Sequence, residues 1–281
     1  MYILQQTLFS FEELLKIEYG ERLPIFFSAL DLTPYVKELT SKSPQGAKGY
    51  NRHAILRALL VAPLEGISTF TSLKKRLDSD IVFRYQCGFN AIQDVPSIST
   101  FSRIFKKITQ KKLAEKLFHD LVEERRKEGI INGTKIAIDS TAINAYEKKQ
   151  PKSKCKDSNN ATWGAKFDSF KNKITWFGYK LHLAVDTESE LPVALEVTPA
   201  HVNDGDMGPV LIDKVNSQAS LKQINFIMMD AGYDQKKNYE AAHNVGAQAI
   251  IPLNLRNEKE PPEGFSSNGT PRCSMGYDMV Y

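Results

Sequence analysis

Two aspartates, Asp139 and Asp230, each follow a short apolar run and lie 91 residues apart in the chain. The runs, Lys135–Ile138 and Ile224–Met229, have the length and composition of strands. In an open α/β sheet, functional side chains gather at the carboxyl ends of the strands. If the two strands are neighbours, both carboxylates enter one crevice.

Two carboxylates at close range repel each other unless a proton or a cation lies between them. Mg²⁺, or alternatively Mn²⁺, is the usual solution where the ligands are oxygen atoms. Asp139 and Asp230 therefore predict a metal site that holds a phosphate. For either aspartate alone, the alternative is a carboxylate that caps the turn after a strand.

The segments around these aspartates predict the sheet that positions them. Trp176–Asp186 alternates strictly, as a strand does, with apolar side chains on one face and Trp176, Lys180, His182 and Asp186 on the other. Leu191–Thr198 alternates too, and Thr187–Glu190 is short enough for a hairpin turn. The order predicts an α/β domain with a mixed sheet, in which an antiparallel three-strand meander precedes a parallel crossover. Its other predicted elements are helices over Asp206–Val215 and Gln235–Asn244 and a strand over Ala247–Ile251.

Lys180 and His182 share one face of their predicted strand with Asp186. They could reach the phosphates of a bound DNA strand, or they could decorate the outer face of a hairpin, and the sequence leaves both open. Asp204 or Asp206 is expected to cap the helix that follows.

Residues 1–130 read as several short helices, because apolar residues recur at helical spacing between Gly and Pro breaks. In Asp94–Ile108 a Pro-Ser start signal precedes a stripe of Ile and Phe that leaves Arg103, Lys106 and Lys107 elsewhere on the helix. These three residues predict a DNA-binding helix. The alternative is a surface amphipathic helix whose basic residues are only solvated.

The chain has 281 residues and an average globular composition, so we expect two domains, 1–130 and 131–281. Residues 1–181 carry 30 Lys+Arg against 19 Asp+Glu, whereas residues 182–281 carry 7 against 14. This asymmetry suits a surface that holds a polyanion and another that concentrates carboxylates, and the alternative is that both are ordinary solvated faces. The Lys-, Ser- and Asn-rich segment Glu147–Asn160 predicts a mobile loop.

No long apolar span and no signal pattern occur, so a cytoplasmic protein with no membrane partner is expected. The three cysteines lie too far apart for a disulfide framework or a zinc ribbon.

Four strings resemble, in order and spacing, the DDE transposases of bacterial insertion sequences. They are Ala-Ile-Asp139-Ser-Thr, Trp-Phe-Gly178-Tyr-Lys180-Leu-His182, Val-Thr-Pro199-Ala-His-Val-Asn-Asp204 and Met-Asp230-Ala-Gly-Tyr233. The helical region with Pro96-Ser-Ile-Ser-Thr-Phe-Ser-Arg103 resembles the domain that these enzymes place before the catalytic one.

The resemblance implies an α+β protein: an all-helical DNA-binding and assembly domain, followed by an α/β RNase H-like catalytic domain with a mixed sheet. It implies that Asp139 and Asp230 are the first and second catalytic aspartates and hold two Mg²⁺ ions, which in two-metal sites lie about 3.5–4 Å apart. The implied chemistry is phosphodiester cleavage and strand transfer. The implied partners are transposon-end and target DNA, on which the protein assembles as a homodimer.

One departure from the family pattern concerns the third carboxylate, a glutamate on a later helix. No such pattern occurs between Pro252 and Tyr281. We therefore expect a catalytic domain that is incomplete at its C-terminus. Two alternatives follow: a catalytically inert DNA-binding protein, or a metal-dependent nuclease of the same fold.

Overall fold

The computed structural model describes residues 22–40, 49–90, 93–149, 151, 160–167, 170, 172–218, 223–254, 261–266 and 270–279. The chain divides into two compact units, Met1–Phe118 and His119–Tyr281, and each is described by itself. The boundary predicted near residue 130 lies just after helix α8 (Leu113–Lys127), and it stays a prediction. Most of the loop predicted over Glu147–Asn160 lies outside the described residues.

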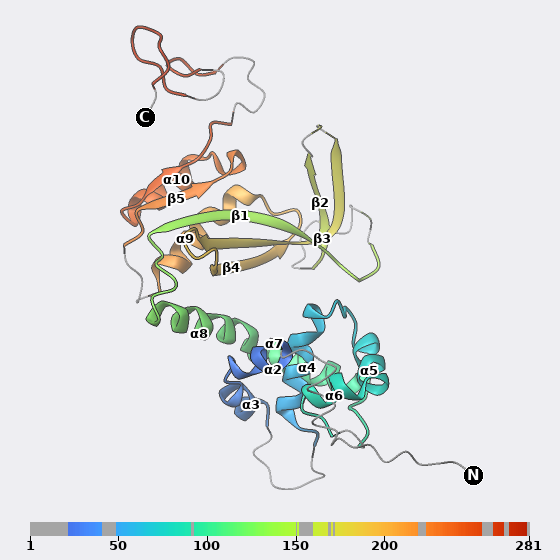
Figure 1. Ribbon diagram of the computed structural model, residues 1–281. Coiled ribbons are helices and arrows are strands. Elements are labelled where there is room, and N and C mark those ends of the chain that lie inside the picture. Colours follow the sequence, from blue (N-terminus) through green and yellow to red (C-terminus); the bar gives the residue numbers. More distant parts are fainter. Residues whose placement is uncertain are drawn as a thin grey trace, which may run out of the picture. The chain divides into compact units, whose positions relative to one another are not determined.

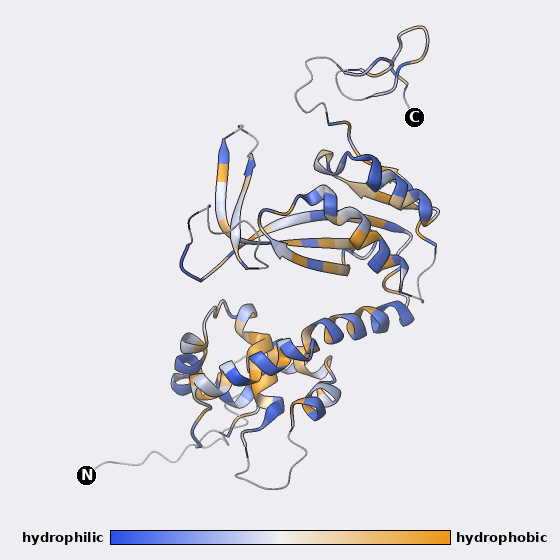
Figure 2. Ribbon diagram, turned by 180° about the vertical axis from the view of Figure 1, so that it is seen from behind, coloured by the Kyte–Doolittle hydropathy of each residue, from blue (hydrophilic) through white to orange (hydrophobic). Residues whose placement is uncertain are grey.

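The first unit is helical, as predicted (Figure 1). Its core forms around α4, from which Ile55, Ala58 and Val61 are fully buried, and Figure 2 shows this helix as strongly hydrophobic. Side chains at the helix starts, such as Asn51 and Ser97, accept hydrogen bonds from backbone N–H groups of the first turn and fix where helices begin. The helices before α8 are α2 (Arg22–Ser28), α3 (Thr33–Leu39), α4 (Arg52–Leu64), α5 (Phe70–Ser79), α6 (Ile81–Gln86) and α7 (Ile98–Gln110).

The second unit holds a mixed sheet. Strand β3 pairs antiparallel with β1 and with β4, while β1, β5 and β6 run parallel, so the predicted meander and crossover are confirmed (Figure 1). This is an RNase H-like arrangement. The strands are β1 (Lys135–Asn144), β2 (Thr162–Phe167), β3 (Lys173–Asp186), β4 (Pro192–Pro199), β5 (Phe226–Met229) and β6 (Gln248–Ile250); the helices are α9 (Asp204–Asn216), η2 (Ala231–Tyr233) and α10 (Lys236–Asn244).

Helix α9 packs on β1, β3 and β4, and α10 packs on α9 and β6. The two helices approach closely because Gly205 and Gly208 of α9 face α10: a Cβ at Gly208 would lie 2.2 Å from the Asn238 side chain. Their packing fixes the α9 N-terminus, where several polar side chains meet.

The face of β3 that α9 covers is the polar one. His182, Ala184 and Asp186 are fully buried, whereas Leu181 and Leu183 keep partial exposure. The alternative that His182 decorates an outer hairpin face is therefore wrong, because α9 turns that face into the interior.

Candidate active site

Asp139 and Asp230 occupy equivalent positions on two adjacent parallel strands. Ile138 of β1 pairs with Met229 of β5, and each aspartate is the next residue along its strand. The structure thus brings the two carboxylates together. One detail differs from the prediction: β1 does not end at Asp139 but continues to Asn144 along β3, so Asp139 lies where β1 loses β5 as a neighbour.

Backbone N–H groups orient both carboxylates. Ser140 N–H donates to Asp139 Oδ1 at 2.7 Å, and Gly232 N–H donates to Asp230 Oδ1 at 2.9 Å. Partial burial is the main cause that raises the pKa of Asp230, and the negative charges of Asp139 and Asp204 raise it further against the Gly232 bond. The site therefore favours a proton or a cation between its carboxylates.

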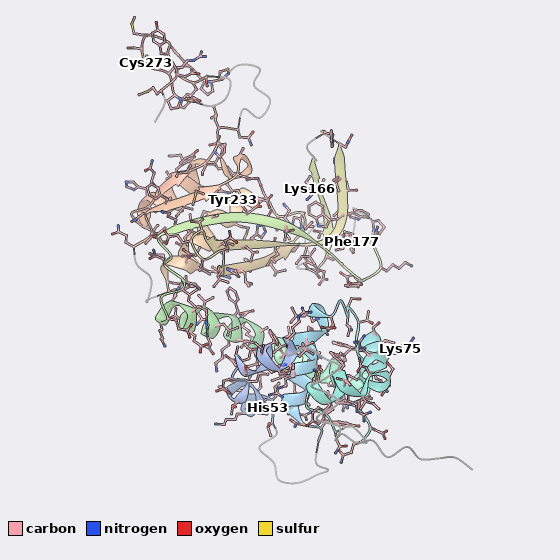
Figure 3. The ribbon with its side chains drawn as sticks, in the orientation of Figure 1. His53, Lys75, Lys166, Phe177, Tyr233 and Cys273 are labelled. Atoms are coloured by element: carbon pink, nitrogen blue, oxygen red, sulfur yellow. The ribbon has the colours of Figure 1, made fainter. Side chains whose placement is uncertain are left out.

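Tyr233 lies in the short η2 turn that follows Asp230 (Figure 3). The residue is fully buried, and burial first, then Asp204, Asp139 and Asp230, raise the pKa of its phenol. The phenol of Tyr233 therefore keeps its proton at pH 7.

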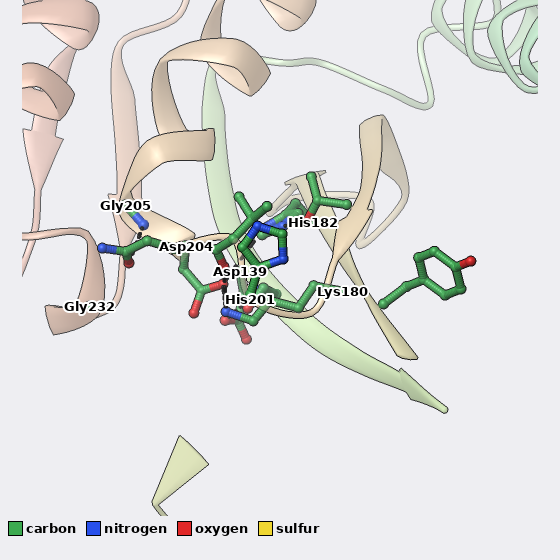
Figure 4. Close-up of polar contacts among 12 residues, drawn as sticks. Asp139, Lys180, His182, His201, Asp204, Gly205 and Gly232 are labelled. Atoms are coloured by element: carbon green, nitrogen blue, oxygen red, sulfur yellow. Dashed lines mark hydrogen bonds and ion pairs between the residues drawn. The ribbon is translucent and has the colours of Figure 1, made fainter. Parts of the chain in front are cut away.

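Asp204, the first residue of α9, is held by Lys180 (Figure 4). Lys180 Nζ donates to Asp204 Oδ1 at 2.9 Å and to the Val202 carbonyl at 2.8 Å. Asp204 was expected to cap the helix, but Asn203 does so by accepting from Gly205 N–H. Asp204 is therefore free to face the acid pair, and Asp206 instead pairs with Lys237.

His182 lies next to this ion pair. Its Nε2 and the Thr198 hydroxyl are 2.9 Å apart, and its Nδ1 is 3.8 Å from Asp204 Oδ1 with no hydrogen-bond partner among the described residues. Burial is the main cause that lowers the pKa of His182, so the ring is neutral at pH 7. Because the side chain has no exposed surface, contact with a phosphate requires the packing of α9 on β3 to open.

A pocket of about 670 Å³ adjoins the acids, lined by Asn203, Gly232, Gln235, Lys236 and Asn254. Gly232 follows Asp230 by two residues and Asn203 precedes Asp204, so the pocket borders the acids of both elements. Its lining is polar or backbone, and Lys236 adds a positive charge suited to an anionic ligand.

The three basic residues predicted on a DNA-binding helix lie on α7, within the first unit. Arg103, Lys106 and Lys107 are exposed and, at i, i+3 and i+4, share one face, while Phe101 and Ile104 are buried. Arg103 also bonds the Ser99 carbonyl and the Thr100 hydroxyl of its own helix. The three side chains are thus exposed to solvent, and DNA as their partner stays a prediction.

Sequence reasoning missed Asp204 and Tyr233 as members of the site. The only indication was that both residues occur in the segments that resemble the family. The spacing of residues does not show that α9 and the turn after β5 meet at the same strand ends. Among the residues that the structure describes, no group of three metal-ligating side chains comes together.

The sequence matches two protein families in succession. Residues 11–107 match a transposase domain (DUF772) and residues 132–270 match the transposase DDE domain, so together they cover most of the chain. The RNase H-like sheet with its aspartate pair defines the class, and the chain belongs to the DDE transposase family.

Two solved structures are similar at low identity. A piggyBac transposase synaptic complex with hairpin DNA aligns with a TM-score of 0.40 and 13% identity, over 80% of this chain and 48% of that one. A Mos1 transposase paired-end complex with the left transposon end aligns with a TM-score of 0.26 and 10% identity, over 85% and 71%. The chain thus spans about half of the piggyBac chain.

No individually curated protein matches the sequence. In the described part of the chain, no helix has the length and apolarity to cross a bilayer.

Proposed function

We propose that this protein is a DNA transposase that cleaves and joins phosphodiester bonds at insertion-sequence ends, with Asp139 and Asp230 as its catalytic, metal-holding residues. The observation that carries the proposal is the register of β1 against β5, which sets the two carboxylates side by side in a chain of this family. DNA, both transposon ends and target, is the partner, and assembly on DNA is as a homodimer.

The donor set fits Mg²⁺, with Mn²⁺ as the alternative. Asp139 and Asp230 offer oxygen ligands. Burial is the main cause that raises the pKa of Asp230, and the negative charge of Asp139 adds to it; a divalent cation would relieve that repulsion. When bound, the metal would activate the attacking hydroxyl and stabilise the leaving oxygen.

The surrounding residues have supporting roles in this proposal. Lys180 holds Asp204 and keeps one N–H donor for a DNA phosphate. His182, buried against Thr198, positions Lys180 and Asp204 rather than touching DNA. On α7, Arg103, Lys106 and Lys107 supply phosphate and base contacts.

A second candidate is a DNA-binding protein without catalysis, or a nuclease of the same fold without strand transfer. It is favoured by the lack, within the described segments, of a third carboxylate at ligand distance from the pair. Asp204 lies nearby, but Lys180 neutralises it.

The test combines metal binding, DNA binding and cleavage. Wild-type protein, Asp139→Asn and Asp230→Asn are titrated with Mn²⁺ by electron paramagnetic resonance, and then incubated with duplexes from the DNA that flanks the coding sequence. Asp213→Asn, on the exposed side of α9, is the matched control.

We expect the wild type and the control to bind Mn²⁺ and to cut the duplex at a defined phosphate, and both site variants to bind DNA but not to cut. Equal Mn²⁺ binding by all four proteins contradicts the metal site. DNA binding and Mn²⁺ binding without cleavage by the wild type select the inert candidate. Cleavage without joining selects the nuclease.

A further inference from the structure

The first part of β3 leaves the sheet with β2 as a separate two-stranded ribbon. Residues Thr162–Phe167 pair with Lys173–Gly178, whereas pairing of β3 with β1 stops at Gly178 and pairing with β4 stops at Tyr179. At about 3.4 Å per residue, the ribbon extends about 17 Å beyond the sheet (Figure 1).

Isolated two-stranded ribbons are only marginally stable, so this one needs support. On one face the Trp176 indole lies on Gly164, where a Cβ would come within 2.4 Å of the ring, and Trp176 Nε1 donates to the Tyr179 carbonyl at 3.1 Å. On the other face, Trp163 packs edge-on against Phe177 with ring centroids 5.6 Å apart. Aromatic packing on both faces makes the base of the ribbon a preformed, rigid support.

The outer part of the ribbon is exposed and basic. Lys166 is paired with Ile174 and Lys173 with residue 167, so the two lysines point to opposite faces. Neither forms an ion pair with a residue that the structure describes, and between them the sequence adds one further lysine and one aspartate. Lys166 lies toward the tip and Phe177 toward the base (Figure 3).

We infer that this ribbon enters the major groove of duplex DNA tip first, with Lys166 contacting the phosphates of one strand and Lys173 those of the other. This rests on the proposed function, since it assigns a surface to the DNA partner. The major groove, about 12 Å wide, admits a two-stranded ribbon, and a sheet layer is about 10 Å thick. The phosphate backbones of the two DNA strands line the two sides of the groove, so lysines on opposite faces of the ribbon can contact one backbone each. A helix with a single basic face can contact only one of them.

The first measurement is the salt dependence of binding to the flanking duplexes, for wild type and Lys166→Ala/Lys173→Ala. Each phosphate contact adds roughly 0.9 to the slope of log affinity against log salt, so the double variant should lower the slope by about 1.8. Lys75→Ala/Lys127→Ala, exposed lysines on α5 and α8, removes the same charge and should leave the slope unchanged. Circular dichroism confirms that all three proteins fold.

The second measurement is methylation protection of guanine N7, an atom of the major groove. Wild type should protect a set of guanines that the ribbon variant exposes and the control variant protects. An equal loss of slope in both variants, or unchanged guanine protection, overturns the ribbon assignment. Wild-type protein that binds no duplex overturns the proposed function itself, whereas unaltered binding by the ribbon variant overturns only this inference.

Discussion

Lys180 Nζ lies 2.9 Å from Asp204 Oδ1, and this ion pair joins β3 to the first residue of α9 beside the acid pair. The lysine side chain is 12% exposed and the aspartate 32%, so solvent screens the pair only in part. Without Lys180, the negative charge of Asp204, which helps to raise the pKa of Asp230, would lose this positive partner. The ion pair therefore offsets part of the repulsion between Asp204 and the acid pair.

Replacing this lysine tests that role. We expect Lys180→Met to destabilise the protein by about 1–3 kcal/mol, because it leaves a half-buried carboxylate without its charged donor. It should also raise the pKa of Asp230 further. Urea unfolding and NMR titration of the carboxyl groups measure the two effects. The matched control is Lys236→Met, an exposed lysine paired with Glu240; an equal loss in the control would assign the effect to general charge instead.

The raised pKa of Asp230 gives stability a defined pH dependence. An acid whose folded pKa lies above its ordinary value of 3.8 favours the protonated folded form, so its unfavourable contribution grows as pH rises from 3.8 through the folded pKa. Asp230→Asn should therefore stabilise the metal-free protein at pH 7 and lose that advantage below 3.8. Thermal unfolding across pH measures this. A wild type that is the more stable protein at pH 7 without metal would contradict it.

His182 should produce the opposite dependence on the acid side. Its folded pKa lies below 6.5, so folding is disfavoured as pH falls from 6.5 through the folded value, where the unfolded chain binds the extra proton. The glutamine of His182→Gln can still form a hydrogen bond with Thr198, and the variant should flatten stability over this window. The control is His119→Gln, an exposed histidine on α8. If His182→Gln keeps the slope of the wild type, the buried neutral ring is not its source.

On the basic face of α7, the two lysines should contribute to DNA affinity and Arg103 to sequence preference. Lys106→Ala and Lys107→Ala are each expected to lower the salt slope by roughly 0.9 without changing which sequence is preferred, since lysine contacts phosphates as a point charge. Arg103→Ala should relax the preference, because arginine reads guanine through two hydrogen bonds. Binding to the flanking duplex and to a scrambled duplex at several salt concentrations separates the two effects. Equal losses on both sequences for all three variants would make α7 a purely electrostatic surface.

The sequence predicted the sheet well because its signals are local. Alternation over Trp176–Asp186, the apolar run before Asp230 and the short turn predicted over Thr187–Glu190 each follow from neighbouring residues. What could not be predicted depends on packing between distant segments. The polar side of β3 is interior only because α9 covers it, and Asp204 joins the site only because Asn203 takes over the capping role.

Strand β2 escaped prediction for a related reason. Its stability comes from Trp176 lying across Gly164, a contact between two strands that neither sequence shows alone. The roles of Asp139 and Asp230 stay a prediction, although the structure sets them on neighbouring strands.

The two halves of strand β3 are expected to differ in the rate at which their amide protons exchange with solvent. From Lys173 to Phe177 its amides have one neighbouring strand, whereas from Tyr179 to Val185 they lie between two. Local opening follows such boundaries, so the ribbon should exchange its amide protons by a low-energy opening that stops near Gly178. The half of the strand beside Asp139 should exchange only when the sheet opens. Motions of the ribbon should therefore leave the positions of Asp139 and Asp230 unchanged.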